Sequence, residues 1–374
     1  MQYGCLALLS NTVRYLGWIF FIYGLSLSTL SAETLLKKYP SYAYVFNEFD
    51  VDESYIYDET FISFVTKNEK RMKHFYTRSV KRGETILPMM QGLLVGDGVS
   101  DLFIYLSMVE SGFTSDAVSS KKAVGLWQFM PATAKQYKLT VCSSYDERCD
   151  TSSATSAAIN YLNKLHKQFG KWYLAALAYN CGEGCVEKAI RKAGSDELSI
   201  LTDNRLKYLP KETRLYMKKI LLVAMIGESL TLDFGYQNND SFIQVEVAGG
   251  TSLKEIANLL KIKTSVLEDL NKGVKNGILP LRKKHYKISI PIEKMYAFYL
   301  RYEISNRVLS KEKEKSHMIT YMVKLGDTLE KIAETYDTKS DVIMFINHLD
   351  NDALLLDTML VIPVSQEKFE KLAQ

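Results

Sequence analysis

Residues 100–110 read SDLFIYLSMVE, and this stretch decides the fold around it. Ser100 is a residue type that caps helix N-termini. The apolar side chains after it fall nearly all round a helix, which is typical of a helix buried in a core. Glu110 ends that helix. On this feature alone an exposed glutamate in a last helical turn is the simpler interpretation, but a carboxyl group at the end of a buried helix has a raised pKa and is a candidate acid.

The segments on either side predict a mainly helical domain. Apolar residues recur at helical spacing within residues 59–90, 154–169, 172–179, 186–193 and 211–228, and Pro131 is placed to open a further helix. Few strand signals occur before residue 240. We therefore expect an N-terminal helical region over residues 33–95 and a helical globular domain over residues 96–232.

An internal repeat follows a linker at residues 235–240, where GYQNND interrupts the helical pattern. The two copies match at a constant offset, from Val247 and Asn271 in the first to Val323 and Asn347 in the second. Each copy, over residues 242–292 and 318–366, predicts a strand, two helices and a closing strand. The charged segment 293–317 between them predicts a helical connector.

The N-terminus predicts export. Arg14 precedes an apolar run over residues 15–30, and small residues follow up to Ala32, which is the pattern of a secretory signal. We slightly favour cleavage over an uncleaved membrane anchor within residues 1–32. Cys5 precedes the apolar run, which argues against a lipoprotein.

Composition excludes some classes of function. The chain has 374 residues and a formal net charge of +4, with no long basic run, so nothing predicts nucleic-acid binding. It has 5 His and no His-x-x-x-His pair, so we expect no metal and no cofactor.

Four cysteines follow the N-terminal segment: Cys142, Cys149, Cys181 and Cys185. An even number in an exported chain suggests disulfides, and four cysteines allow three pairings. We favour the local pairs Cys142–Cys149 and Cys181–Cys185 as structural staples. A zinc site is the alternative, which the spacing does not favour.

Three more segments carry polar groups beside glycines and aromatic rings. They are GLWQFMP at residues 125–131, AYNCGEG at residues 178–184 and YLPKETRLY at residues 208–216. Each alone suits core filling, a helix cap or a turn, and Trp127 alone is more typical of a core. Taken in order with ESGF at residues 110–113, they make a far more specific pattern.

This ordered set resembles the lytic murein transglycosylases with the goose-type lysozyme fold, over roughly residues 70–225. Residues 146–150 and 212–216 resemble the membrane-bound type D subgroup. The repeats resemble LysM domains, which bind glycans containing N-acetylglucosamine, and the second copy is the closer match. The implied fold class is multidomain, with a mainly α lysozyme-like domain followed by two small α+β modules of βααβ order.

The resemblance also implies residue roles. Glu110 would be the general acid and then the general base. The implied substrate-binding residues are Ser111, Gln128, Met130, Tyr179, Asn180, Glu212 and Tyr216. The implied glycan-binding residues of the second repeat are Gly326, Asp327, Thr328 and Asn347.

The implied reaction breaks the β-1,4 bond between N-acetylmuramic acid and N-acetylglucosamine. The sugar's own 6-hydroxyl attacks in place of water and gives a 1,6-anhydro end, which explains why one carboxyl group suffices. The expected partner is the peptidoglycan glycan strand, the expected location is the bacterial periplasm, and we expect a monomer.

Two alternatives stay open on the sequence. A goose-type lysozyme would hydrolyse the bond and need a second acid, for which Glu183 is the obvious candidate. A non-catalytic scaffold would only bind the wall. The chain also departs from the family pattern before residue 125, where Ser120 and Lys122 stand in place of Pro and Gly.

Overall fold

The computed structural model describes residues 32–230, 242–302, 316–347, 349 and 352–372. These residues fall into two compact units. Unit 1 contains the described residues up to Leu139 together with those from Thr151 to 230, and unit 2 contains Thr140–Asp150 and the residues after the linker. Each unit is described by itself below.

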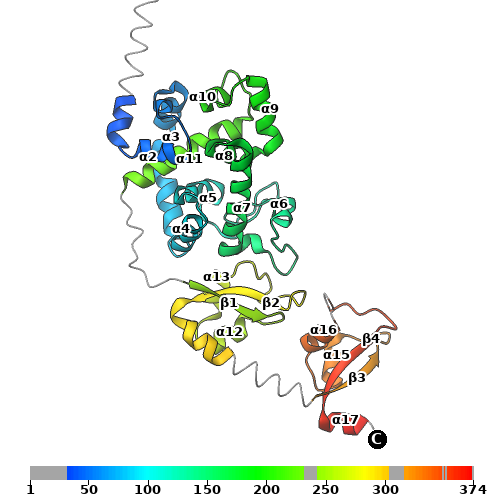
Figure 1. The fold of residues 1–374 in the computed structure, drawn as a ribbon. Coiled ribbons are helices and arrows are strands. Elements are labelled where there is room, and N and C mark those ends of the chain that lie inside the picture. The colour runs from blue at the N-terminus through cyan, green and yellow to red at the C-terminus, as the bar shows by residue number, and fades with distance from the viewer. Residues whose placement is uncertain (1–31, 231–241, 303–315, 348, 350–351, 373–374) are drawn as a thin grey trace, which may run out of the picture. The chain divides into compact units, whose positions relative to one another are not determined.

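Unit 1 is built from helices, as predicted (Figure 1). Residues 32–38 are helical. The elements that follow are α2 (Tyr42–Glu48), η1 (Glu53–Tyr57), α3 (Glu59–Gly83), α4 (Leu87–Gly96), η2 (Asp101–Phe103), α5 (Ile104–Ser111), α6 (Pro131–Gln136), α7 (Thr151–Phe169), α8 (Trp172–Cys181), α9 (Glu183–Ala193), α10 (Leu198–Leu201) and α11 (Lys211–Ser229).

In the core of unit 1, α11 packs against α3, α5 and α8. The first five residues of α5 are buried, as the all-round apolar pattern predicts. Residues 173–178 of α8 are buried as well. Ser100 acts as a cap, but it caps the short η2 that precedes α5, because its Oγ accepts from Leu102 N at 3.3 Å.

Trp127 lies in this core and not on a surface. Its side chain is 0% exposed, and its Nε1–H donates to Thr155 Oγ1 at 3.0 Å. A buried tryptophan normally finds such a partner for its polar atom. The GLWQ segment is therefore anchored to α7 through its largest side chain.

Unit 2 contains both repeats in the predicted order of strand, helix, helix, strand. The first repeat has β1 (Phe242–Ala248), α12 (Leu253–Leu260), α13 (Thr264–Leu270) and β2 (His285–Pro291). It continues into η4 (Ile292–Lys294) and a helix over residues 295–302. The second repeat has β3 (Ser316–Met322), α15 (Leu329–Thr335), α16 (Ser340–Ile346), β4 (Met359–Ser365) and α17 (Gln366–Leu372). Each strand pair is antiparallel, with Val247 opposite Tyr286 and Met322 opposite Met359.

The repeated asparagine has the same structural task in both copies. Asn271 donates to Leu267 O and Ser289 O, both at 2.8 Å, and accepts from Ser289 N at 2.7 Å. Asn347 makes the equivalent bonds to Ile343 O and to the backbone of Val361. Its amide therefore ties the second helix of each repeat to the closing strand.

Thr140–Asp150 belongs to unit 2, although we predicted that residues 96–232 form one domain. Tyr145 is buried in the core of the first repeat, with its ring centroid 5.0 Å from that of Tyr286. Asp146 N donates to Gly273 O at 2.9 Å, and a Cβ on Gly273 would lie 2.7 Å from the carbonyl oxygen of Asp146. A glycine at 273 is what allows the two backbones to approach so closely.

Some predictions fall outside the described residues. The signal or anchor over residues 1–32 lies there except for Ala32, and so does most of the connector, from 303 to 315. Within the described ranges, no helix is both long enough and apolar enough to cross a membrane.

Candidate active site

Glu110 lies in the last turn of α5, directly before a sharp turn. Gly112 follows with φ 58°, and its N–H donates to Met108 O at 2.7 Å, which closes the helix. A Cβ on Gly112 would lie 3.0 Å from the Arg82 side chain and 3.1 Å from Ser79 Oγ. Left-handed backbone and close packing thus both favour glycine at this place. The turn fixes where the helix ends and so where the Glu110 carboxyl group lies.

Tyr216 binds the Glu110 carboxyl group from α11. Its Oη donates to Glu110 Oε1, and the ring of Tyr216 is buried. Burial raises the pKa of Glu110 to about 7, and the nearby charge of Glu212 raises it too. The Tyr216 hydrogen bond and the charge of Lys219 act in the opposite direction. A large fraction of Glu110 is therefore protonated near neutral pH, as a general acid requires.

Tyr179 joins two of the predicted segments beside Glu110. Its Oη donates to Trp127 O at 2.7 Å, so that α8 supports the GLWQ loop. Its ring packs against Phe129 at 6.2 Å and Tyr161 at 5.2 Å between centroids. Burial raises the pKa of Tyr179, and the charge of Glu110 adds to that effect, which places the phenol near the carboxyl group.

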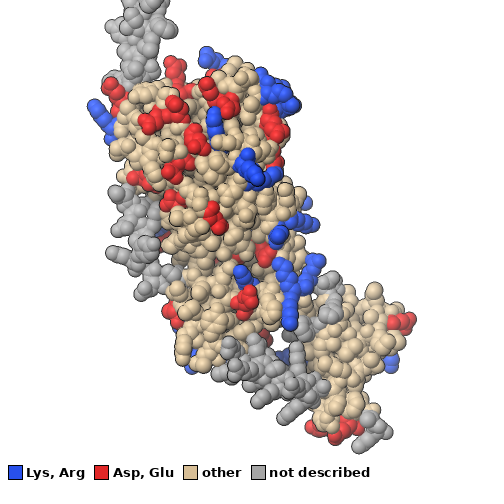
Figure 2. All heavy atoms as spheres, in the orientation of Figure 1, with Lys and Arg blue, Asp and Glu red and all other residues tan. Residues whose placement is uncertain are grey.

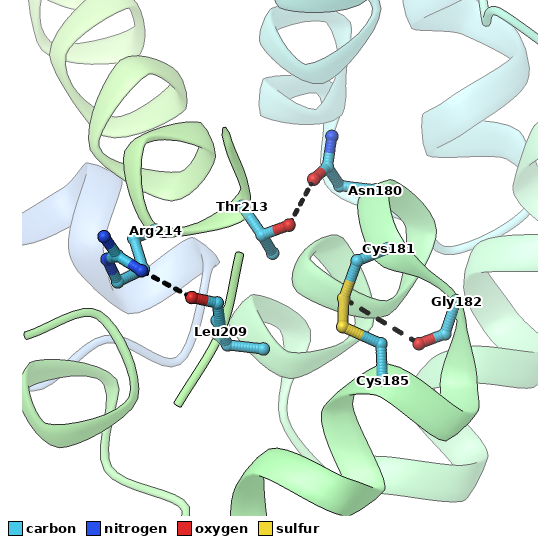
Figure 3. The surroundings of a disulfide bond; sticks show 7 residues. All are labelled: Asn180, Cys181, Gly182, Cys185, Leu209, Thr213 and Arg214. Atoms are coloured by element: carbon cyan, nitrogen blue, oxygen red, sulfur yellow. Dashed lines mark hydrogen bonds between the residues drawn. A yellow bond between two sulfur atoms is a disulfide. The ribbon is translucent and has the colours of Figure 1, made fainter. Parts of the chain in front are cut away.

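Asn180 is held by the third segment. Its Oδ1 accepts from Thr213 Oγ1 at 2.8 Å, as Figure 3 shows. Among the described residues nothing accepts a hydrogen bond from its Nδ2, so the amide has two donors left for a ligand.

The cysteine beside Asn180 forms one of the two predicted disulfides. Cys181 and Cys185 are joined, with their Cα atoms 5.8 Å apart, and the bond links the end of α8 to the first turn of α9 (Figure 3). The predicted pair Cys142–Cys149 is wrong, because both residues are thiols. Cys142 Sγ lies 3.3 Å from Tyr145 O, and Cys149 Sγ lies 3.5 Å from Lys275 Nζ. Packing of Thr140–Asp150 in unit 2 holds this segment in place of a disulfide.

Two other predicted residues bond within their own segments. Gln128 has φ 48°, and its Nε2 donates to Gly125 O at 2.9 Å and Ala117 O at 3.2 Å. Ser111 Oγ donates to Ser107 O at 3.3 Å. Both side chains therefore shape the backbone around Glu110 and make no bond to its carboxyl group.

Met130 and Glu212 are exposed. Met130 is the residue before α6. Glu212 lies 3.9 Å from Lys121 across the surface. Both side chains face solvent, where a ligand can reach them.

Three residues that interact with predicted site residues were not themselves predicted: Tyr161, Thr213 and Lys219. Lys219 follows Glu212 and Tyr216 at helical spacing on α11, so these three share one face of that helix. That spacing was a usable signal in the sequence. Thr213 and Tyr161 gave no signal, because their partners lie on other helices.

Glu183, the candidate second acid, forms an ion pair with Lys164. Its carboxylate pairs with Lys164 Nζ, and that hydrogen bond lowers the pKa of Glu183. An ionised carboxylate can serve as a general base, but this one already has a cationic partner.

Three of the four predicted glycan residues of the second repeat, Gly326, Asp327 and Thr328, form one turn. Gly326 has φ 88°, and Asp327 accepts from Lys324 N at 2.8 Å and from Tyr321 Oη at 2.7 Å. Thr328 caps α15. Asn347 directly follows α16, and its amide bonds to the repeat's own backbone. These bonds build the module, and glycan binding by it stays a prediction.

A hollow of about 880 Å³ in unit 1 is lined by none of the predicted site residues. Acidic side chains gather near α2 on the face drawn in Figure 2, and Asp50, Asp52 and Asp58 line the hollow there. Each of these three accepts from a backbone N–H, on Trp172, Ser54 and Phe61 respectively. Asp52 and Asp58 thus cap η1 and α3, and Asp50 binds the first backbone N–H of α8.

Family models match three parts of the chain. Residues 97–201 match the transglycosylase SLT domain. Residues 241–306 match the LysM-like domain of lytic transglycosylase MltD, and residues 321–363 match the LysM domain.

Individual relatives agree with these matches. Membrane-bound lytic murein transglycosylase D of Escherichia coli K12 is 31% identical over 243 residues, which are 62% of this chain and 52% of that protein. This chain thus spans about half the length of that relative. Peptidoglycan transglycosylase gp16 of Escherichia phage T7 is 35% identical over 131 residues, 34% of this chain and 9% of its own. Among solved structures, the 70 kDa soluble lytic transglycosylase of Escherichia coli aligns with a TM-score of 0.34 and 21% identity over 38% of this chain and 24% of that one.

Proposed function

We propose that this chain, which carries a transglycosylase SLT domain followed by two LysM-type domains, is a peptidoglycan lytic transglycosylase with Glu110 as its acid and base. The observation that carries the proposal is the Glu110 carboxyl group at the end of α5, which Tyr216 binds where the three predicted segments meet and whose pKa burial raises to about 7. Murein transglycosylase activity in the named relatives supports the same assignment.

The proposed reaction balances with one carboxyl group. Glu110 gives its proton to the bridging oxygen, and the bond from that oxygen to C1 of the muramic acid residue breaks. The 6-hydroxyl oxygen of the same sugar bonds to C1, and its proton returns to the Glu110 carboxylate. The products are a free 4-hydroxyl end and a 1,6-anhydro end, and Glu110 is restored. The amide donors of Asn180 would bind polar groups of the sugar.

The remaining modules extend the proposal. The two repeats would bind glycan and hold the catalytic domain on its insoluble substrate, which raises the local substrate concentration. Export to the periplasm by the segment within residues 1–32 belongs to the proposal as well, with cleavage favoured over an uncleaved anchor.

The first expected result concerns the products. Purified chain incubated with sacculi should release muropeptides with 1,6-anhydro ends, which are 18 mass units lighter than the hydrolysed products because no water is added. Mass spectrometry of the soluble fraction checks this. Reducing ends instead would support the lysozyme alternative, and no release at all would support the scaffold.

The second expected result concerns pH. Glu110 must carry a proton to act as the acid, and its pKa is about 7, so the release rate should fall as pH rises through about 7. Glu212→Gln removes a charge that raises this pKa, so it should move the midpoint of the fall in release rate to lower pH. Lys219→Met should move it to higher pH, because the lysine charge lowers the pKa. Rates measured from pH 5 to 9 check the sign of each shift, and shifts in the same direction would contradict the assignment to Glu110.

A further inference from the structure

Two tyrosine–glutamate hydrogen bonds join α5 to α11. The first is the bond from Tyr216 to Glu110 described above. In the second, α5 supplies the tyrosine and α11 the glutamate. Tyr105 Oη on α5 donates to Glu228 Oε1 on α11 at 2.8 Å. Tyr105 lies in the first turn of α5 and Glu110 in the last, so the two bonds hold α5 at its two ends.

Tyr105 is fitted closely onto α11. The residue is 1% exposed, and its ring centroid lies 6.4 Å from that of Tyr76 on α3. A Cβ added at Gly227 would lie 2.1 Å from Tyr105 Oη, so the phenol occupies the space that a side chain at position 227 would need. The hydroxyl group thus reaches Glu228 only because the preceding residue is glycine.

The proposed reaction makes no use of this second pair, and none of the predicted site residues belongs to it. A helix held at one point can turn about that point, whereas a helix held at both ends cannot. Because Tyr105 and Glu110 belong to the same helix, a rotation of α5 at Tyr105 displaces the Glu110 carboxyl group. It also displaces the GLWQ loop, since Ser107 Oγ on α5 donates to Leu126 O at 3.0 Å.

We infer that Tyr105 and Glu228 are positioning residues, whose hydrogen bond fixes α5 on α11 and so keeps the Glu110 carboxyl group against Tyr216 and the bond to be cleaved. This inference rests on the proposed function. Misplacing a reacting group by about 1 Å can cost about a hundredfold in rate. A contact far from the sugar can therefore control the chemical step.

The test uses full-length variants and soluble glycan strands as substrate, with anhydro ends counted by mass spectrometry. Tyr105→Phe keeps the ring and removes the donor, while Glu228→Leu removes the acceptor. Both should lower kcat by about tenfold to a hundredfold with KM unchanged. Glu228→Gln keeps an acceptor oxygen and should stay near the wild-type rate. Tyr55→Phe is the matched control, because it removes a hydroxyl hydrogen bond of 3.1 Å, to Thr202 Oγ1, from a buried ring elsewhere in unit 1.

The pH profile separates positioning from simple loss of stability. The Tyr216 bond lowers the pKa of Glu110, so a variant that loosens this bond should move the fall in rate to higher pH. Partial unfolding lowers the amplitude and leaves the midpoint unchanged. Folded Tyr105→Phe and Glu228→Leu proteins with wild-type kcat and midpoint would overturn the inference, and so would a Glu228→Gln variant as slow as Glu228→Leu. If Tyr105→Phe does not fold, the comparison of Glu228→Leu with Glu228→Gln decides alone. Wild-type protein without anhydro products would instead refute the proposed function.

Discussion

Glu110→Gln should reduce the release of anhydro-muropeptides from sacculi by about a hundredfold to ten-thousandfold, which is the usual contribution of a general acid–base group. Glutamine keeps the size of the side chain and still accepts a hydrogen bond from Tyr216, but it has no proton to give. The measurement is the initial rate of release at pH 6, where most of the wild-type carboxyl group is protonated because its pKa is about 7.

The control for this variant is its stability. The pKa of Glu110 is higher in the folded chain than the usual value of 4.5, so the folded state binds this proton more tightly than the unfolded state does. Stability therefore falls as pH rises through about 7, and the glutamine variant has no such loss. It should melt no lower than the wild type at pH 8. A matched Glu183→Gln variant should keep most of its activity, since Glu183 is paired with Lys164. Anhydro products from a well-folded Glu110→Gln protein would remove the basis of the mechanism.

Trp127→Ala should lower the free energy of unfolding of unit 1 by about 3–5 kcal/mol, the range measured for large aromatic residues removed from cores. Trp127 is 0% exposed and lies between Thr155 on α7 and Tyr179 on α8. Its loss leaves a cavity, and Thr155 Oγ1 loses the indole donor. Urea denaturation followed by far-ultraviolet circular dichroism measures the change, because unit 1 contains most of the helices.

An exposed aromatic residue gives the comparison. Tyr57 is 50% exposed in the same unit, and Tyr57→Ala should change the free energy of unfolding by about 0.5 kcal/mol or less. If Trp127→Ala instead left stability unchanged and raised KM, the ring would be a sugar platform, and its buried position in the core would be mistaken.

Two different signals in the sequence predict the helices and the site. Local periodicity predicts most of the helices, and the ordered motifs predict which residues share a site. Local periodicity finds α3, α7, α8 and α11, because burial of one face imposes a helical spacing on the sequence. It says nothing of which helices meet. The family resemblance of the ordered motifs implies that Tyr216 and Glu110 belong to one site, and the spacing of Lys219 from Tyr216 would have added one residue more.

What the sequence did not reveal are contacts between distant segments. Tyr145 packs with Tyr286, and Asp146 pairs with Gly273, although more than a hundred residues separate them. No local pattern in residues 140–150 marks them as part of another core. The mistaken disulfide has the same origin, since short spacing and an even number of cysteines are local clues. Tyr105 and Glu228 were not predicted because no sequence pattern pairs a tyrosine on one helix with a glutamate on another.

The membership of Thr140–Asp150 in unit 2 decides where this protein can be shortened. A recombinant fragment that ends at residue 230 keeps this segment but lacks Gly273, Val274 and Tyr286, against which it packs. The Tyr145 ring and unpaired backbone groups would then face water, and such exposed edges promote aggregation. The better boundary for expression lies at the end of the helix over residues 295–302, so that the first repeat stays with unit 1 and only the second is removed.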